Sequence, residues 1–410
     1  MPKINARRLL SDLHQLSLFG ANNPGVIRPA FSQADIEARK WLKKQYEEAG
    51  LEAGLDGVGN VLGRSRQKGP ALLIGSHSDS QPTGGWLDGA LGVIYGLETA
   101  RAFAEDPKTQ RFAIDAVSWQ DEESRFFSSL GSRSFCGKIP PGTLKDLRDK
   151  QGISLDQARK EAGLFNVPVF TVEKDRYLGY LEGHIEQGPQ LELEEKRIGV
   201  VSSIVGLRGS VFKFTGQQNH AGTTMMNIRK DASAALYALA YSINEEFPKV
   251  AGDRSVWTMG RVSIHPGAPS IVPGTAELEL QYRDASTDIL DAFARTEQRL
   301  VRKINERGGA RVENISSRDP IHPSLMHPNF VKNLELAAEG HVPGKWLTMP
   351  SGAYHDAGVL QEVMPSGMLF IPSIGGISHD FAENSHEEDI VLGCQVLADA
   401  AASLMKSELS

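Results

Sequence analysis

Residues 71–106 read ALLIGSHSDSQPTGGWLDGALGVIYGLETARAFAED, in which a short apolar run, a polar glycine-rich segment and a longer apolar segment follow one another. The run at 71–74 predicts a buried strand, and residues 75–79 leave its carboxyl end. After Asp88 the apolar residues recur at helical spacing, including Leu91, Tyr95 and Ala102, which predicts a helix that begins near Asp88. A strand followed directly by a helix is the repeating unit of an α/β fold.

Three further apolar runs end in histidine or acidic residues. They read FAIDAVSWQDEES (112–124), RYLGYLEGHIEQGP (176–189) and GMLFIPSIGGISHD (367–380), and a final helix is predicted from about Glu387. Strands that alternate with helices in this way indicate an α/β domain with a doubly wound mixed sheet.

The middle of the chain has a different pattern. Strands are predicted at 209–216, 255–264, 275–284 and 310–317, and helices at 229–247 and 289–309, the second with Ile289, Phe293, Leu300 and Ile304 on one face. This βαββαβ order, over about Arg208 to Asp319, is typical of a ferredoxin-like α+β domain. We therefore expect a discontinuous catalytic domain at 1–207 and 325–410, interrupted by an inserted domain at 208–324 that serves as a dimerisation and lid domain.

Composition excludes several classes of protein. The 410 residues include 44 Lys and Arg against 51 Asp and Glu, so the formal net charge is −7, which argues against non-specific nucleic-acid binding and a basic membrane-binding face. No apolar run approaches the roughly 20 residues of a membrane span, and residues 1–20 lack the apolar centre of a signal peptide. The two cysteines, Cys136 and Cys394, form no disulfide framework, so we expect a cytoplasmic protein.

Polar residues gather where the predicted strands end. Ligand sites in open α/β sheets form at the carboxyl ends of strands, so residues that are more than 300 positions apart in the sequence can converge there. The candidates are His77, Asp88, Glu122, Glu123, His184 and His379. Such mixed nitrogen and oxygen donors suit zinc, and also manganese, cobalt or nickel.

Each candidate has a plainer alternative when it is taken alone. Asp88 is placed to be an ordinary helix N-cap. Glu122 and Glu123 could belong to a solvated acidic turn, although their side chains point in different directions, so that one could bind a metal while the other serves as a general base. Each histidine could be an ordinary surface, capping or buried residue that binds no metal. The set as a whole favours a site for two metals, an arrangement known from aminopeptidase-type hydrolysis.

The motifs that carry these residues resemble a known family. GSHSDSQPTGGWLDGALGVIYGLE (75–98), DEESRF (121–126), HIEQGPQLE (184–192), NHAGTT (219–224) and GISH (376–379) are similar, in this order, to the hydantoinase/carbamoylase branch of the di-zinc aminoacylase-like hydrolases. The resemblance implies two divalent metal ions per chain. One would be held by His77, Asp88 and His184, and the other by Asp88, Glu123 and His379, with Asp88 as the shared ligand.

The resemblance also implies roles for residues beside the metals. Glu122 would be the general base that deprotonates water, and Asp79 would orient His77. Gln187 would line the substrate pocket, and His355 would lie beside the site. A rival for the ligand His379 is His386, which we expect to be an exposed residue at a helix start because only His379 matches the GISH position.

Further roles fall on the inserted domain. His220 would reach the site of the partner subunit in a homodimer and polarise the scissile carbonyl, and Arg283 would bind the substrate carboxylate. The chain departs from the family pattern at Met225, Ser270 and Gln281, where Pro, Asn and Asp are usual. Ser270 would replace an asparagine that helps bind the carboxylate, so the substrate is expected to differ although the metal and base positions are intact.

The sequence thus predicts a metal-dependent amidohydrolase acting on a small N-carbamoyl amino acid or an allantoate-like ureido carboxylate. The alternatives are a di-zinc peptidase or N-acyl amino acid hydrolase, and a metal-binding paralogue that has lost turnover. A dinucleotide enzyme is a poor interpretation of TGGWLDGALG, because the glycine spacing lacks the fingerprint and acidic residues would face the pyrophosphate.

Overall fold

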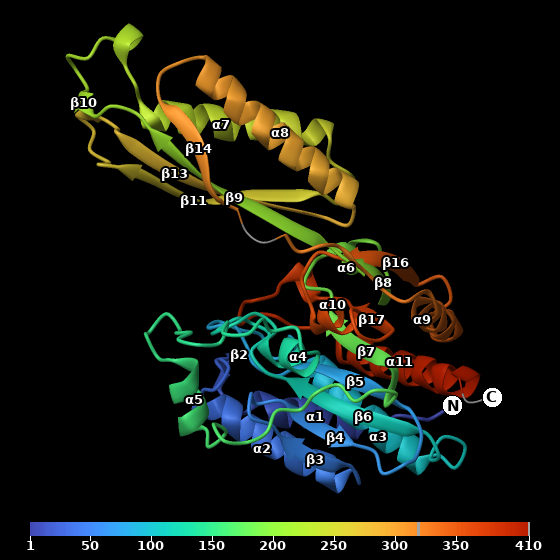
Figure 1. Ribbon diagram of the computed structural model, residues 1–410. Helices are drawn as coiled ribbons and strands as arrows, with labels where there is room; N and C mark the ends of the chain where they lie inside the picture. Colours follow the sequence, from blue (N-terminus) through green and yellow to red (C-terminus); the bar gives the residue numbers. More distant parts are fainter. Residues whose placement is uncertain (318–319, 409–410) are drawn as a thin grey trace. The chain divides into compact units, whose positions relative to one another are not determined.

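The computed structural model describes residues 1–317 and 320–408 and contains two compact units (Figure 1). The first comprises Met1–Ser202 and Leu325–Ser410, and the second comprises Ser203–Ser324. The first boundary thus lies slightly before the one expected from the sequence at 207/208, and the second lies at 324/325.

The first unit is built on a mixed β-sheet. Its four central strands are β17 (Ser366–Ile371), β7 (Tyr177–Ile185), β5 (Ala71–His77) and β6 (Ala113–Trp119), and each is parallel to its neighbours within this group of four. The full order is β15-β8-β17-β7-β5-β6-β4-β3, and β16 pairs with β8. The outer strands are β3 (Glu52–Leu55), β4 (Val61–Arg64), β8 (Ile198–Ile204), β15 (Ser324–Leu325) and β16 (Trp346–Ser351). Strand β4 is antiparallel to β3 and β6, and β8 is antiparallel to β17, so the expected mixed α/β fold is confirmed.

Helices bury the apolar residues of this sheet. The long helices are α1 (Ala6–Ser17), α2 (Gln33–Glu48), α3 (Ala90–Glu105), α9 (Pro328–His341) and α11 (Glu387–Glu408). Helix α3 packs against β5, β6, α1 and α11. Shorter elements are β1 (Ala21–Asn22), β2 (Gly25–Val26), α4 (Leu130–Phe135), α5 (Leu155–Glu161), α6 (Gln190–Leu193), α10 (Asp356–Leu360) and η3 (Ile374–Gly376).

Helix α11 corrects one sequence expectation. It is long and apolar enough to span a membrane by length and composition alone, although no such run was expected. Most of it is buried, and it packs against α3, α9, β7 and β17. Helix α11 is therefore explained as the core helix of this unit.

The second unit has the elements β9 (Gly206–Thr215), α7 (Ala232–Glu246), β11 (Val256–His265), β13 (Thr275–Asp284), α8 (Thr287–Glu306) and β14 (Arg311–Ser317). The antiparallel sheet order is β11-β13-β9-β14, and α7 and α8 pack on it through a core that includes Phe212, Leu239, Phe247 and Phe293. The order along the chain is βαββαβ. The smaller elements are β10 (Asn219–His220), η1 (Met226–Ile228), η2 (Phe247–Lys249) and β12 (Ile271–Val272).

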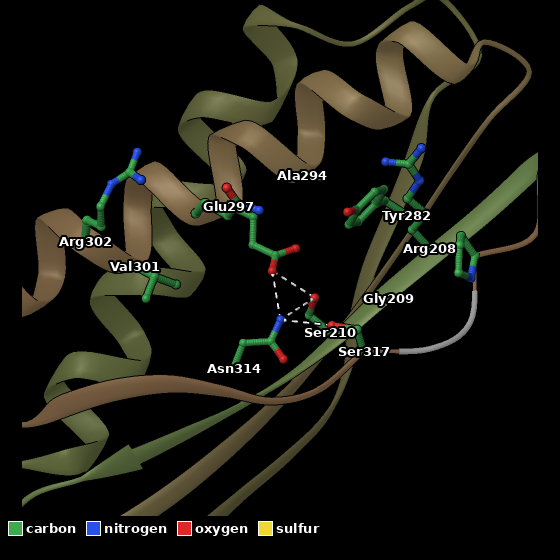
Figure 2. A pocket seen from close by; sticks show the side chains of 12 residues that line it. Arg208, Gly209, Ser210, Tyr282, Ala294, Glu297, Val301, Arg302, Asn314 and Ser317 are labelled. Atoms are coloured by element: carbon green, nitrogen blue, oxygen red, sulfur yellow. Dashed lines mark hydrogen bonds between the residues drawn. The ribbon is translucent and has the colours of Figure 1, made fainter.

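A pocket of about 500 Å³ lies between α8 and the sheet of the second unit (Figure 2). Glu297 reaches from α8 toward the sheet, and its Oε1 accepts hydrogen bonds from Ser210 Oγ at 2.8 Å and from Asn314 Nδ2 at 3.3 Å. Burial raises the pKa of Glu297, and the hydrogen bonds from Ser210 and Asn314 lower it by less. The hydrogen-bond partners of this buried carboxyl group are thus neutral, and among the described residues it forms no salt bridge.

Within each unit, the two segments that lead to the other unit are joined by backbone hydrogen bonds. In the first unit, Met326 N donates to Ser202 O at 3.0 Å. In the second unit, Leu207 and Ile321 exchange two backbone hydrogen bonds of 2.9 Å. The entry and exit strands of the insertion therefore run side by side.

Candidate metal centre

The sheet of the first unit brings the predicted ligands to one edge. Strand β5 ends at His77 and strand β7 carries His184 next to its last residue, and these two strands are parallel neighbours. Glu122 and Glu123 follow β6, and His379 follows β17, so all of them lie beyond carboxyl ends of strands. This convergence is what the geometry of an open α/β sheet favours.

A first group consists of His77, Asp88 and His184, all buried, whose ligand atoms lie within 4.8 Å of one another. Asp88 Oδ1 is 3.6 Å from His77 Nε2 and 3.2 Å from His184 Nε2. The Nδ1 atom of His77 is 3.1 Å from the carbonyl oxygen of Asp79, and that of His184 is 2.9 Å from the carbonyl oxygen of Ile185. Because Nδ1 of each ring faces a backbone carbonyl, the Nε2 atom faces Asp88 and can bind a metal ion once its proton is displaced, as in metal-binding histidines.

A second group consists of Asp88, Glu123 and His379. His379 Nε2 is 3.2 Å from Asp88 Oδ2 and 3.8 Å from Glu123 Oε1. Glu123 Oε2 accepts a hydrogen bond from Gln81 at 2.6 Å, whereas Glu123 Oε1 is buried and receives none from the described residues. That orphaned oxygen is available to a cation. The two groups share Asp88 and use one of its oxygens each.

The alternative of Asp88 as an N-cap is wrong. Helix α3 begins at Ala90, its N-cap residue is Gly89, and no side chain caps it. Gly89 has φ 64°, and a Cβ atom added there would lie 2.5 Å from three atoms of the His77 ring. Only glycine fits this position, and the turn it makes leaves the Asp88 carboxylate facing the histidines.

The charges of the cluster also fit divalent cations. Burial would raise the pKa of Asp88, but the nearby imidazoles of His184, His379 and His77 hold it well below the usual range. Burial raises the pKa of Glu123 to about 7, and the neighbouring Asp88 carboxylate raises that of His379 to about 9. Without a metal, protons on the imidazoles balance the carboxylates. Divalent ions would replace those protons, which is the usual linkage between metal binding and protonation.

Glu122 lies beside the first group without belonging to either group. Its Oε2 is 3.8 Å from His77 Nε2, and its side chain is 11% exposed. Burial raises the pKa of Glu122 well above its usual value, and the charge on Glu123 raises it further, against the opposing effect of His77. A carboxylate with a raised pKa can accept a proton near neutral pH and release it again.

Asp79 and Gln187 contact the ligands. The Asp79 carboxylate is 3.7 Å from His77 Nδ1, too far for a hydrogen bond, so the backbone carbonyl of Asp79 holds the imidazole. Asp79 Oδ2 accepts instead from Glu123 N at 3.2 Å. Gln187 Nε2 donates to Asp88 Oδ2 at 3.1 Å and lies 3.3 Å from His379 Nε2.

His355 and His386 lie outside both ligand groups. The ring of His355 packs edge-on against His184 with centroids 4.6 Å apart, and its Nε2 is 2.9 Å from Ser351 Oγ. Burial holds the pKa of His355 well below the usual value, so this imidazole is neutral. His386 is exposed just before α11.

The remaining predicted residues lie in the second unit. His220, on β10, is exposed, and its Nδ1 accepts hydrogen bonds from Gly222 N at 3.0 Å and Thr223 N at 3.2 Å. The carbonyl oxygen of Ser270 accepts from Ala221 N at 2.9 Å, so the segments of His220 and Ser270 are held together. Arg283 lies on β13, and its Nη2 donates to Gln281 Oε1 at 3.3 Å.

Glu383 is a site residue that the sequence analysis missed. It is 1% exposed, and its Oε1 accepts from the backbone N–H of Asp88 at 3.0 Å. It stands four positions after His379, but nothing in the local pattern marks it, because its partner is 295 positions away in the chain.

Comparison with known proteins places these residues in a wider context. Residues 73–403 match the family model described as peptidase family M20/M25/M40. An N-carbamoyl-L-amino acid amidohydrolase of Geobacillus stearothermophilus is 34% identical, covering 99% of this chain and 100% of its own. An allantoate amidohydrolase of Bacillus subtilis is 31% identical over 97% of both chains. A crystal structure of an amidase of the hydantoinase/carbamoylase family from Burkholderia phymatum has 49% identity and a TM-score of 0.94 over 99% of both chains.

Proposed function

The chain belongs to peptidase family M20/M25/M40, and from this membership and the geometry of its candidate metal centre we propose that it is a metal-dependent amidohydrolase. The proposed substrate is an N-carbamoyl amino acid or a related ureido carboxylate, such as allantoate. The resemblance to the hydantoinase/carbamoylase branch, noted in the sequence, is confirmed by the relatives. The observation that carries the proposal is the sharing of Asp88 by two ligand groups with Glu122 beside them.

Two divalent ions are the proposed cofactors. His77, Asp88 and His184 would hold one, and Asp88, Glu123 and His379 would hold the other. The donor set suits zinc, with manganese, cobalt or nickel as alternatives. Ions bound there supply positive charge that acidifies water and polarises the substrate carbonyl.

The protein residues perform the proton transfers and hold the substrate. Glu122 takes a proton from water as the water attacks the carbonyl carbon, and it gives that proton to the leaving nitrogen when the C–N bond breaks. For an N-carbamoyl substrate the products are the free amine, ammonia and carbon dioxide. In this proposal Gln187 contacts the substrate near the ligands, which its hydrogen bond to Asp88 supports, and His355 packs edge-on against His184.

The second unit completes the proposed reaction. Arg283 binds the substrate carboxylate and His220 stabilises the oxyanion, acting across a homodimer for which this unit is the dimerisation and lid domain. Ser270 has a shorter side chain than the asparagine usual in the family, so its contact with the substrate carboxylate is weaker or displaced in this proposal. The unpaired cysteines Cys136 and Cys394 support the proposal of a cytoplasmic location.

A substrate panel tests this function. The metal-reconstituted enzyme is assayed on N-carbamoyl amino acids, allantoate, N-acyl amino acids and dipeptides, with the Glu122→Gln variant as the control for the base. Turnover of ureido substrates above the others supports the proposal. Preference for acyl amino acids or dipeptides would assign an aminoacylase or peptidase activity instead. Stoichiometric metal with no amide turnover on any substrate would indicate a paralogue that only binds metal.

A further inference from the structure

Glu383 joins two segments that carry metal-ligand candidates. Its carboxylate oxygen Oε1 accepts hydrogen bonds from Leu87 N at 3.3 Å and Asp88 N at 3.0 Å. Its other oxygen, Oε2, accepts from Ser378 Oγ at 2.7 Å. One buried side chain thus holds the backbone of the segment before α3 and the residue that immediately precedes His379.

The two segments are shaped around this carboxylate. A Cβ atom added at Gly85 would lie 1.9 Å from Glu383 Oε1, so any residue larger than glycine at position 85 would collide with this carboxyl group. A parallel contact reinforces the first, because Trp86 Nε1 donates to Asn384 Oδ1 at 3.3 Å. Asn384 O in turn accepts from Ile374 N at 2.9 Å, which ties the second segment back to the end of β17.

The ligands on these segments need such support. His77 and His184 are part of the central strands β5 and β7, whereas His379 lies on an irregular segment with φ 55° and its side chain is 50% exposed. Its distance of 3.2 Å to Asp88 Oδ2 is therefore set by how the segment at 374–385 is held to the segment at 84–89. The buried carboxyl group of Glu383 makes this connection.

We propose that Glu383 is a positioning residue that fixes Asp88 and His379 relative to each other and so forms the second ligand group. This rests on the proposed function, in which that group holds a divalent ion. A carboxylate is suited to the task because both of its oxygens accept, and hydrogen bonds to an ionised acceptor are stronger than neutral ones. A glutamine of the same size keeps one accepting oxygen for the backbone N–H groups, and its amide N–H can donate to Ser378 Oγ. Glu383→Gln therefore replaces charge-assisted hydrogen bonds with weaker neutral ones.

The test uses the full-length protein with Glu383→Gln and a matched control, Glu297→Gln. Glu297 is also a buried, hydrogen-bonded glutamate, but it lies on α8 of the second unit, where its partners are Ser210 and Asn314 (Figure 2). The first measurement is amide hydrogen exchange at Leu87 and Asp88 in metal-free protein. Faster exchange is expected in Glu383→Gln and not in Glu297→Gln, and unchanged exchange would overturn the proposal.

The second measurement is a zinc titration against a chromophoric chelator. We expect the wild type and Glu297→Gln to bind two ions, and Glu383→Gln to bind the weaker of the two about 10- to 100-fold less tightly, the usual effect of losing a residue that orients a ligand. Wild-type affinity for both ions in Glu383→Gln would overturn the positioning role. A wild type that binds none of zinc, manganese, cobalt and nickel would instead overturn the proposed function, and the exchange result would separate the two failures.

A milder variant protects the test against misfolding. Ser378→Ala removes one hydrogen bond to Glu383 and leaves every ligand and both backbone contacts in place. Ser378→Ala is expected to lower the affinity for the more weakly bound ion, as Glu383→Gln does, but by a smaller factor. An affinity equal to that of the wild type in a folded Ser378→Ala protein, together with normal binding in Glu383→Gln, would refute the connection between the two segments.

Discussion

Gly89→Ala is a substitution of a single methyl group whose effect on the metal centre can be worked out from the structure. The new Cβ would lie 2.5 Å from three atoms of the His77 ring, where ordinary van der Waals contact begins at 3.4 Å. The ring and the start of α3 must therefore separate from 2.5 Å to at least 3.4 Å, a shift of about 0.9 Å. Gly89 N also lies 3.2 Å from His184 Nε2, so both histidines of the first group are displaced.

A misplacement of about 1 Å in a catalytic site costs roughly 100-fold in rate. That factor corresponds to about 2.7 kcal/mol of transition-state stabilisation. The φ of 64° with ψ −46° lies outside the left-handed helical region, near the strained γ-turn conformation, and adds about 1–3 kcal/mol of backbone strain for alanine, so the free energy of unfolding also decreases.

The assays are kcat on the best substrate of the panel, bound metal by elemental analysis, and the unfolding midpoint in denaturant. The matched control is Gly340→Ala in α9, where an added Cβ meets open space and alanine should leave turnover unchanged and stabilise the helix slightly, by up to about 1 kcal/mol. If Gly89→Ala binds two ions and turns over at the wild-type rate, the contact between Gly89 and His77 does not hold the site and the reasoning is wrong.

Three further predictions follow from the site and from the second unit. Glu122→Gln should lower kcat by about 10²- to 10⁴-fold, the usual contribution of a general base, with both ions retained, and unaltered turnover would remove Glu122 from the mechanism. A chelator should abolish turnover and lower the unfolding temperature, and added zinc, manganese, cobalt or nickel should restore both, whereas activity that persists in metal-free protein would contradict the metal assignment. Burial raises the pKa of Glu297, so the native state holds this proton more tightly than the unfolded state does, and wild-type stability should fall as the pH rises above the ordinary carboxyl range. Glu297→Gln should lack this part of the pH dependence in denaturant midpoints between pH 4 and pH 8, and identical profiles would count against the raised pKa.

The strand-end residues could be predicted from the sequence because their positions follow from local rules. His77 and His184 each end an apolar run, and parallel strands bring such ends to one edge of a sheet. The outer strands gave no such signal. Strand β3, for example, reads EAGL at residues 52–55, which has no apolar run, and it forms because β4 offers a hydrogen-bonding edge beside it.

Asp88 and Glu383 show where sequence reasoning reaches its limit. The sequence left Asp88 as either a cap or a ligand, and the decision came from the close approach of Gly89 to His77, which is a tertiary contact. No sequence pattern marked Glu383, because the two backbone N–H groups that donate to it, those of Leu87 and Asp88, are almost 300 residues away in the chain. A residue that positions metal ligands through hydrogen bonds to their backbone cannot be recognised from the spacing of side chains in the sequence.

The paired ends at the boundary between the units have a consequence for how this protein can change. Since Ser202 and Met326 are hydrogen-bonded in the first unit, a short turn is enough to rejoin the chain there if residues 203–324 are excised. Leu207 and Ile321 close the second unit in the same way. Exchange of the whole insertion between related chains would therefore leave the hydrogen-bonded ends of both units intact, so this boundary is a natural point for recombination.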